Sequence, residues 1–267
     1  MCATCGCSDG PGVRVTDLRH GHGHGHGHTP DQPHEHDRAH DHDHGDAGRV
    51  VTLERDVLAG NDRLAARNRV ALARRGILAL NLMSSPGSGK TTLLVRTLTD
   101  LGAGLPISVV EGDQETLLDA ERIGATGARV VQVNTGAGCH LDAAMLADAV
   151  AVLDPPDGSL LLVENVGNLV CPALFDLGEA ARVVVMSVTE GADKPLKYPH
   201  MFRTADLVLI NKIDLLPYVE FDVARCVDGA RRARPGVEVI EVSATRGDGL
   251  EGWYAWLDQR RAALSRA

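Results

Sequence analysis

A glycine-rich run at residues 84–91 could hold the phosphates of a nucleotide. It reads SSPGSGKT and matches the pattern G-x-x-x-x-G-K-[ST], with Ser84 in place of the first glycine. In such a loop, glycines let backbone N–H groups face the phosphates, the lysine reaches the β and γ oxygens, and the threonine hydroxyl binds Mg²⁺. A glycine-rich turn with an ordinary lysine is the alternative. The residues predicted to bind phosphate are Gly87, Ser88, Gly89, Lys90, Thr91 and Thr92.

Two further boxes follow apolar runs and could bind a guanine base. Residues 211–214 read NKID. The Asp214 carboxylate can accept hydrogen bonds from the ring N1–H and the exocyclic amine of guanine, a donor pair that adenine does not present. Residues 243–245 read SAT and resemble a second guanine-contacting box. We therefore predict that GTP or GDP is bound by Asn211, Lys212, Asp214, Ser243 and Ala244.

Three residues between these boxes could complete a site for phosphate hydrolysis. Asp113 and Glu164 each end an apolar run, and the backbone N–H of Gly167 could sense a γ-phosphate. The predicted catalytic residues are Lys90, Asp113 and Glu164, and the predicted Mg²⁺ ligands are Thr91 and Asp113. Catalysis would depend on positioning and electrostatics. Slow intrinsic hydrolysis is predicted, because no arginine finger stands out and asparagine, not glutamine, follows Gly167.

The first 44 residues carry two groups of metal-ligand side chains. Cys2, Cys5 and Cys7, with the terminal amine, offer three sulfurs and one nitrogen, which suits square-planar Ni²⁺ or tetrahedral Zn²⁺. Three exposed thiols without a role are the alternative. Ten of the twelve histidines fall in residues 20–44, where a flexible tract would bind several ions weakly. An engineered affinity tag is the alternative for that tract.

A third group of candidate ligands lies in the rest of the chain. Cys139 and His140 stand between a predicted strand and a predicted helix, and Cys171 lies four residues beyond Gly167. Three ligands are one short of a closed tetrahedral site, whereas a twofold dimer would bring six ligands together for one or two metals. Two buried structural cysteines are the alternative. Cys226 is interpreted as a core or surface residue.

Strands and helices alternate along residues 77–264, and they must position these side chains. Apolar runs predict strands over residues 77–83, 106–111, 128–133, 159–164, 182–188, 205–211 and 237–243. Helical periodicity predicts helices over residues 91–101, 141–153, 221–233 and 249–264. Such alternation is typical of an α/β fold with a mostly parallel, doubly wound sheet. Its ligand sits beyond the carboxyl ends of the strands.

Composition divides the chain into three parts. Residues 1–49 have almost no large apolar side chains and are expected to form a disordered metal-binding tail. Residues 50–76 predict a helix, in which Val57, Leu58, Leu64, Ala65 and Leu72 recur at helical spacing. That helix either packs on the following domain or docks a partner. Residues 77–267 form the predicted GTPase domain.

Charge and hydropathy exclude several functional classes. The net charge of −9 disfavours binding to nucleic acid, whose phosphates attract basic faces. No apolar run reaches the roughly 18–20 residues that a membrane span needs, and no secretory signal is apparent. We expect a cytoplasmic protein that contacts neither nucleic acid nor membrane.

The sequence resembles the HypB family, the GTPases that help insert nickel into [NiFe]-hydrogenase. The resemblance covers nearly the full length and rests on long runs such as MCATCGC, NLMSSPGSGKTTLL, QVNTGAGCHLDA, ENVGNLVCPALFDLGE and SVTEGADKPLKYPHMF. It implies a P-loop fold of the signal-recognition-particle/MinD class that dimerises in response to GTP. It also implies a tight nickel site at Cys2, Cys5 and Cys7, and a weaker nickel or zinc site at Cys139, His140 and Cys171 in the dimer interface.

The resemblance further implies a set of partners. These are the zinc-containing companion maturation protein HypA, a nickel metallochaperone and the hydrogenase large subunit. Lys194 matches a family lysine linked to nucleotide-dependent dimerisation, although a solvated loop lysine is the alternative. The histidine tract is associated with nickel storage.

These observations predict a GTP-hydrolysing nickel metallochaperone in which dimerisation gates the binding and release of nickel. A nickel store, with the GTPase domain docking partners, is one alternative. A related GTPase serving urease or cobalamin enzymes is another, against which the CxxCxC start and the pairing of Cys139-His140 with Cys171 argue.

Overall fold

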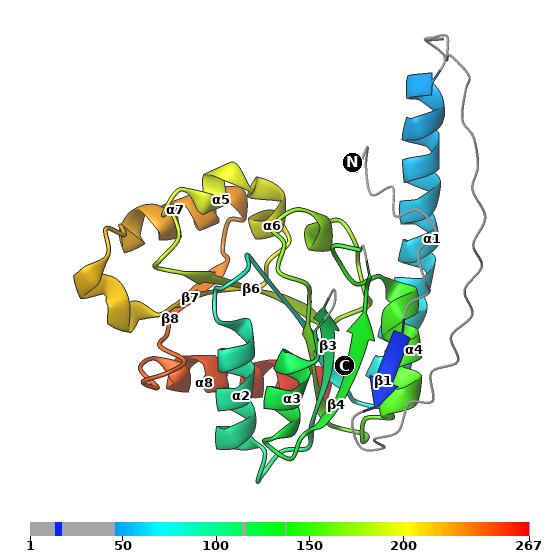
Figure 1. Ribbon diagram of the computed structural model, residues 1–267, viewed down its shortest axis with the longest axis horizontal. Coiled ribbons are helices and arrows are strands. Elements are labelled where there is room, and N and C mark those ends of the chain that lie inside the picture. The colour runs from blue at the N-terminus through cyan, green and yellow to red at the C-terminus, as the bar shows by residue number, and fades with distance from the viewer. Residues whose placement is uncertain (1–13, 18–45, 114–115, 137, 267) are drawn as a thin grey trace, which may run out of the picture.

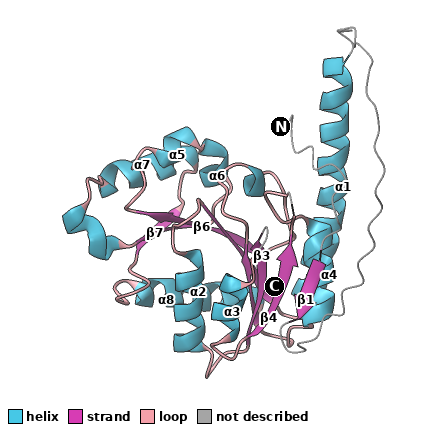
Figure 2. Cartoon of the chain, in the orientation of Figure 1, coloured by secondary structure: helices cyan, strands magenta, loops and turns pink. Residues whose placement is uncertain are grey.

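The fold is an eight-stranded sheet covered by helices on both faces (Figures 1 and 2). The computed structural model describes residues 14–17, 46–113, 116–136 and 138–266. The strand order is β1-β4-β3-β5-β2-β6-β7-β8, and only β1 is antiparallel to its neighbour. The strands are β1 (Arg14–Asp17), β2 (Leu78–Ser84), β3 (Ile107–Asp113), β4 (Arg129–Asn134), β5 (Leu160–Glu164), β6 (Ala181–Ser187), β7 (Leu207–Asn211) and β8 (Glu238–Glu241). The seven strands predicted from residue 77 onward are therefore confirmed.

The helices divide between the two faces of the sheet. They are α1 (Asp46–Arg74), α2 (Lys90–Leu101), α3 (Leu118–Gly124), α4 (Ala143–Leu153), α5 (Lys194–Lys197), α6 (Pro199–Arg203), α7 (Val223–Ala233) and α8 (Leu250–Leu264). Two short 3-10 helices, η1 (Cys171–Ala173) and η2 (Ile213–Tyr218), lie in loops. None of the described helices is both long and apolar enough to cross a membrane.

One face of the sheet packs against α2, α3 and α8. Alternate residues of the central strands point to this side, among them Leu80 of β2 and Leu162 of β5, and meet Leu94 of α2 and Trp253 of α8. Trp253 is completely buried, and its indole N–H donates to the Thr97 hydroxyl over 3.0 Å. This layer fixes α2, whose first turn carries the glycine-rich loop.

The other face packs against α1 and α4 on one half of the sheet and against α6 and α7 on the other, with α5 packed on these two helices. Val163 of β5 contributes to the first half, with Leu146 of α4 and Leu72 of α1. Met186 of β6 contributes to the second half, with Phe202 of α6. The central strands are therefore mostly apolar on both faces, as a parallel sheet buried on both sides requires.

The carboxyl-terminal half of the helix α1 packs on the domain that follows it. For this half, the prediction that the helix packs on the following domain is therefore confirmed. Ala65 and Leu72 are buried. Asn61 and Asn68 donate from their side-chain amides to the carbonyls of residues 176 and 177. Val57, grouped by periodicity with the buried positions, is 53% exposed, because this part of α1 extends away from the sheet (Figure 1). The helix runs from residue 46 to residue 74, not from 50 to 76.

The short strand β1 differs from the expectation of an unstructured segment over residues 1–49. Its four residues pair antiparallel with β4, with Arg14 opposite Asn134 and Asp17 opposite Val131. An edge strand presents unpaired backbone groups, so even a short polar segment can gain hydrogen bonds by adding to it. The remaining residues of the expected tail, up to residue 45, lie outside the described part of the chain.

Candidate functional site

The glycine-rich loop joins β2 to α2, as the sequence predicts. β2 ends at Ser84 and α2 begins at Lys90, with Gly89 at its N-cap in the left-handed conformation (φ 96°). A Cβ at this glycine would lie 2.5 Å from the side-chain nitrogen of Asn211, so close approach as well as backbone conformation requires glycine. The loop therefore turns its backbone toward a helix N-terminus, the arrangement that binds phosphate.

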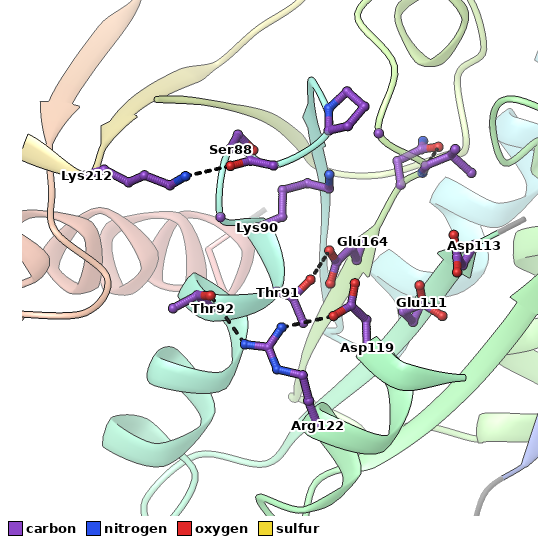
Figure 3. Close-up of a pocket in the computed structure, with 17 residues that line it drawn as sticks. Ser88, Lys90, Thr91, Thr92, Glu111, Asp113, Asp119, Arg122, Glu164 and Lys212 are labelled. Atoms are coloured by element: carbon purple, nitrogen blue, oxygen red, sulfur yellow. Dashed lines mark hydrogen bonds and ion pairs between the residues drawn. The ribbon is translucent and has the colours of Figure 1, made fainter. Parts of the chain in front are cut away.

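A cavity of about 500 Å³ opens over this loop (Figure 3). Lys90 lies in it and is only 8% exposed. Its Nζ donates to the Ser84 hydroxyl over 2.6 Å, so the residue that replaces the first glycine holds the lysine in place. Burial lowers the pKa of the Lys90 ammonium, against the opposing attraction of nearby carboxylates such as Glu164. Phosphate oxygens at this ammonium would favour its charged form.

Three carboxylates line the opposite wall of the cavity. Glu111 and Asp113 come from β3 and Glu164 from the end of β5. Burial, followed by repulsion from Glu164 and Asp113, raises the pKa of Glu111 to about 8. Burial also raises the pKa of Glu164 to about 7. The positive charges of Lys90 and Arg122, which line the same cavity, oppose the rise in the pKa of Glu164 but are outweighed by burial.

The same wall has the donor set of a divalent-cation site. One carboxylate oxygen of Glu111 and one of Glu164 are buried without a hydrogen-bond partner among the described residues. The Thr91 hydroxyl donates to the other oxygen of Glu164 over 2.8 Å. Oxygen ligands from carboxylates and hydroxyls are those that Mg²⁺ prefers. The residues present therefore fit Mg²⁺.

The predicted guanine-binding boxes meet behind the loop. Asn211 donates to the carbonyl of Ser88 over 2.9 Å and accepts from the backbone N–H of Ala244 over 3.1 Å. The Lys212 ammonium donates to the carbonyl of Gly87 over 2.7 Å. These contacts tie the two boxes to the phosphate loop.

Asp214 and Ser243 form a separate pair within these boxes. The Ser243 hydroxyl donates to one Asp214 oxygen over 2.6 Å and fixes the carboxylate. Within this set, Asn211 and Lys212 thus support the loop, and Asp214 is the side chain whose chemistry fits a base edge.

Gly167 sits against the glycine-rich loop. A Cβ at this position would lie 3.1 Å from both the Cα and the nitrogen of Pro86, so a side chain here would press the two loops apart. The next side chain, Asn168, accepts from the backbone N–H of Val170 over 2.8 Å. Its carbonyl oxygen is therefore used within its own loop, which agrees with a poor water-positioning role.

Two residues of α3 that the sequence did not indicate also line the cavity. Arg122 forms an ion pair with Asp119 at 3.0 Å and donates to the Thr92 hydroxyl over 3.4 Å (Figure 3). The only signal was an acidic and a basic residue three positions apart in the run LDAERI. A seven-residue helix is too short to stand out by periodicity.

Cys139, His140 and Cys171 come together as predicted. One ligand atom from each lies within 4.8 Å of the other two. His140 is buried, stacks on the Phe175 ring with 3.9 Å between centroids, and has a pKa lowered by burial, so its imidazole stays neutral and able to bind metal. Cys171 begins η1, in the same loop as Gly167. Cys139 and Cys171 therefore belong to one cluster of candidate metal ligands.

The remaining predicted residues fall in three places. Lys194 begins α5, and its ammonium lies 3.7 Å from Glu190, which accepts a 2.5 Å hydrogen bond from Ser85 of the phosphate loop. Cys226 is fully buried beside Met186, and burial raises the pKa of its thiol to about 12, which confirms a core residue. Cys2, Cys5, Cys7 and the histidine tract lie outside the described residues.

Comparison with known proteins agrees with this geometry. A family model described as "CobW/HypB/UreG, nucleotide-binding domain" matches residues 78–241. The hydrogenase maturation factor HypB of Azotobacter vinelandii is 57% identical over 219 residues, which cover 82% of this chain and 72% of that protein. The corresponding protein of Escherichia coli K12 is 58% identical over 215 residues, covering 80% and 74%.

Two solved structures are also similar. A crystal structure of HypB from Archaeoglobus fulgidus matches with a TM-score of 0.71 and 42% identity, over 76% of this chain and 99% of that one. A crystal structure of HypB from Helicobacter pylori in complex with nickel matches with a TM-score of 0.72 and 38% identity, over 76% and 96%. The chain therefore belongs to the HypB family of hydrogenase maturation factors, whose nucleotide-binding domain is that of a P-loop GTPase.

Proposed function

We propose that this protein is a GTP-hydrolysing nickel metallochaperone for [NiFe]-hydrogenase. The observation that carries the proposal is the clustering of Cys139, His140 and Cys171, with Cys171 in the loop that brings Gly167 to the nucleotide cavity. A change at the γ-phosphate can therefore reach a nickel ligand through four residues of chain. The nickel complex of the Helicobacter pylori relative supports nickel as the cargo.

The nucleotide site does its chemistry by position and charge. Lys90 would bind the β and γ oxygens, Gly167 would donate its backbone N–H to the γ-phosphate, and Asp214 would select guanine. Thr91 and Asp113, with Glu164 beside them, would hold Mg²⁺, which supplies positive charge to the phosphates when bound. Slow hydrolysis is expected because Arg122 is paired with Asp119 and Asn168 is engaged in its own loop.

The ligand set favours a dimer as the nickel-holding state. Three protein ligands leave a tetrahedral site open, and a twofold axis beside them would supply three more. The side chains of Val170 and Leu174, on either side of Cys171, are 52% and 45% exposed. Burial of these apolar groups against a second copy would stabilise the contact. GTP would favour this dimer, with Lys194 taking part, and hydrolysis would loosen the ligand set.

By family membership we further propose zinc as an occupant of the same site. HypA, a nickel metallochaperone and the hydrogenase large subunit are the proposed partners. The proposed domains are a metal-binding segment before α1, the helix α1 (Asp46–Arg74) and a GTPase domain over residues 77–267. The chain is proposed to act in the cytoplasm.

Replacing Cys171 with serine is expected to abolish thiolate–nickel binding in the GTPase domain. The experiment uses the full chain with Cys2, Cys5 and Cys7 changed to serine, so that thiolate-to-nickel absorption reports only on the remaining cysteines. The hydroxyl of serine does not replace the thiolate that Ni²⁺ prefers. We expect Cys171→Ser to lose the absorption, and hydrogenase activity in the host to fall even when nickel is ample.

Cys226→Ala is the matched control. It also removes one cysteine, but from the core beside Met186. Its absorption should equal that of the parent. Retention of the full band in Cys171→Ser would show that Cys171 is not a ligand, and loss of the band in Cys226→Ala would show that Cys226 is one.

Nickel storage is a second candidate function, favoured by the ten histidines of residues 20–44. Changing these histidines to glutamine in the host separates the two. Loss of hydrogenase activity only at low nickel indicates that the tract stores nickel. Loss that persists in ample nickel indicates that nickel is delivered through the tract.

A further inference from the structure

We infer that Asn165 is a positioning residue that couples the nucleotide cavity to the segment carrying Cys139 and His140. The inference deepens the proposed function and rests on it. Asn165 follows β5 directly, lines the cavity and is 1% exposed. Its side-chain oxygen accepts from the backbone N–H of Val166 over 3.0 Å and from that of Leu141 over 3.1 Å.

These two hydrogen bonds join the two functional loops at one atom. Val166 immediately precedes Gly167, and Leu141 immediately follows His140. Asn165 and Leu141 are 24 apart in sequence, so no local turn accounts for their hydrogen bond. A displacement of the loop at Gly167 must therefore carry the Asn165 oxygen with it or break one of its two bonds.

The amide of Asn165 is held in this orientation by a buried network. Its nitrogen donates to Asn81 over 3.2 Å, and the Asn81 amide donates in turn to Glu179 over 3.3 Å. Arg182 donates to the same Glu179 oxygen over 2.6 Å. Because backbone N–H groups can only donate, the network leaves the Asn165 oxygen as the atom that must face both loops. A fully satisfied network of this kind is rigid.

Glu179, at the far end of this network, also connects to His140, through the loop that carries Phe175. The second Glu179 oxygen accepts from the backbone N–H of Leu177 over 2.8 Å. Phe175, two residues earlier, stacks on the His140 ring. His140 therefore has two neighbours that the network holds. Leu141 follows it in the chain and donates a hydrogen bond to Asn165, and Phe175 stacks on its ring from the loop that Glu179 fixes.

The hydrogen bonds of Asn165 couple the nucleotide cavity to ligands that the backbone of the Gly167 loop does not reach. Cys171 can follow Gly167 through the backbone of its own loop, but Cys139 and His140 belong to the segment between β4 and α4. Asn165 lets both sets of ligands respond to the same movement. Without it, the direct link between the loop at Gly167 and the segment that carries Cys139 and His140 would be lost.

The test measures how nucleotide changes nickel affinity in the full chain with Cys2, Cys5 and Cys7 changed to serine. Ni²⁺ is titrated with saturating GDP and with a non-hydrolysable GTP analogue, and bound nickel is read from thiolate absorption. We expect the two Kd values to differ by roughly 5–150-fold in the parent and by less than about twofold in Asn165→Ala. The analogue's own affinity should depend on Ni²⁺ by the same factor, because coupling is reciprocal.

Asn61→Ala is the matched control. Asn61 is also a buried asparagine, and its oxygen accepts from the backbone N–H of Ala143 over 2.9 Å while its nitrogen donates to the carbonyl of Asp176. It holds the same segment from α1 and meets the loop after β5 at Asp176, beyond η1, and not at the residues beside Gly167. The parental ratio should persist in this variant even if its midpoint of thermal unfolding falls.

The outcomes distinguish the role of Asn165 from the nucleotide gating of nickel binding on which it rests. A parent whose two Kd values agree would overturn nucleotide gating itself. A parent that couples, with Asn165→Ala retaining the full ratio or Asn61→Ala losing it equally, would overturn only the role of Asn165. If Asn165→Ala does not fold, Asn81→Ala is measured instead, because it releases the Asn165 amide. A reduced ratio there supports the inference, and an unchanged ratio contradicts it.

Discussion

Replacing Asp214 with asparagine is expected to exchange the guanine preference of the site for xanthine. The carboxylate accepts from the N1–H and the exocyclic amine of guanine, whereas xanthine carries a carbonyl in place of that amine. An asparagine amide can donate to this carbonyl and still accept from N1–H. Ser243 holds the side chain at 2.6 Å, so the new amide should keep its place.

The size of this effect follows from unpaired polar groups. A site built to hydrogen-bond a group rejects an analogue without it by on the order of 10⁴-fold, and we expect a loss of GTP affinity of that order. Competition between GTP and xanthosine triphosphate for a fluorescent nucleotide measures it. Asp222→Asn makes the same charge change at the N-cap of α7, where asparagine caps as well as aspartate, and should leave both affinities unchanged. Unaltered GTP binding by Asp214→Asn would remove the guanine assignment.

Replacing Lys90 with alanine is expected to abolish tight nucleotide binding. The ammonium is buried in the cavity, and in the complex it would pair with phosphate oxygens shielded from water. Truncating one partner of a buried, hydrogen-bonded charge pair costs about 2–5 kcal/mol, or roughly 30- to 5,000-fold in Kd. Titration with a fluorescent GDP analogue gives this ratio directly.

The stability of the nucleotide-free variant serves as the control for Lys90→Ala. Without ligand, Lys90 donates to the Ser84 hydroxyl, and its burial disfavours its own charge. Removing it should therefore cost little folding stability, and the thermal midpoint without nucleotide should stay near that of the parent. Binding of GDP by the variant as tightly as by the parent would contradict the phosphate-binding role of the lysine.

The sequence predicted the parts of the site that follow strand ends. Glu164, Asn211 and Ser84 each stand where an apolar run stops, and parallel strands bring such ends to one edge of the sheet. Periodicity and turn chemistry are local signals, so they located these residues well. The joining of Cys139 and His140 to Cys171 was also predictable, because the first two follow β4 and the third follows β5.

The parts that escaped prediction depend on pairing between distant segments. Strand β1 exists through its pairing with β4, and its four residues are too few to carry a periodic signal of their own. The side-chain amide of Asn165 reaches Asn81, 84 positions away, across neighbouring strands whose register no single sequence specifies. Val57 is exposed because α1 extends past the part of the domain that it packs against, and the length of that contact is not written in the helix's own sequence.

The most direct test of nucleotide-gated nickel delivery is a single turnover of GTP by the nickel-loaded, full-length protein. Phosphate release and the transfer of Ni²⁺ to a coloured chelator are recorded together. The account predicts that nickel appears in step with phosphate and stays bound when a non-hydrolysable analogue replaces GTP. Nickel that reaches the chelator at the same rate with either nucleotide would contradict gating and leave storage as the better description.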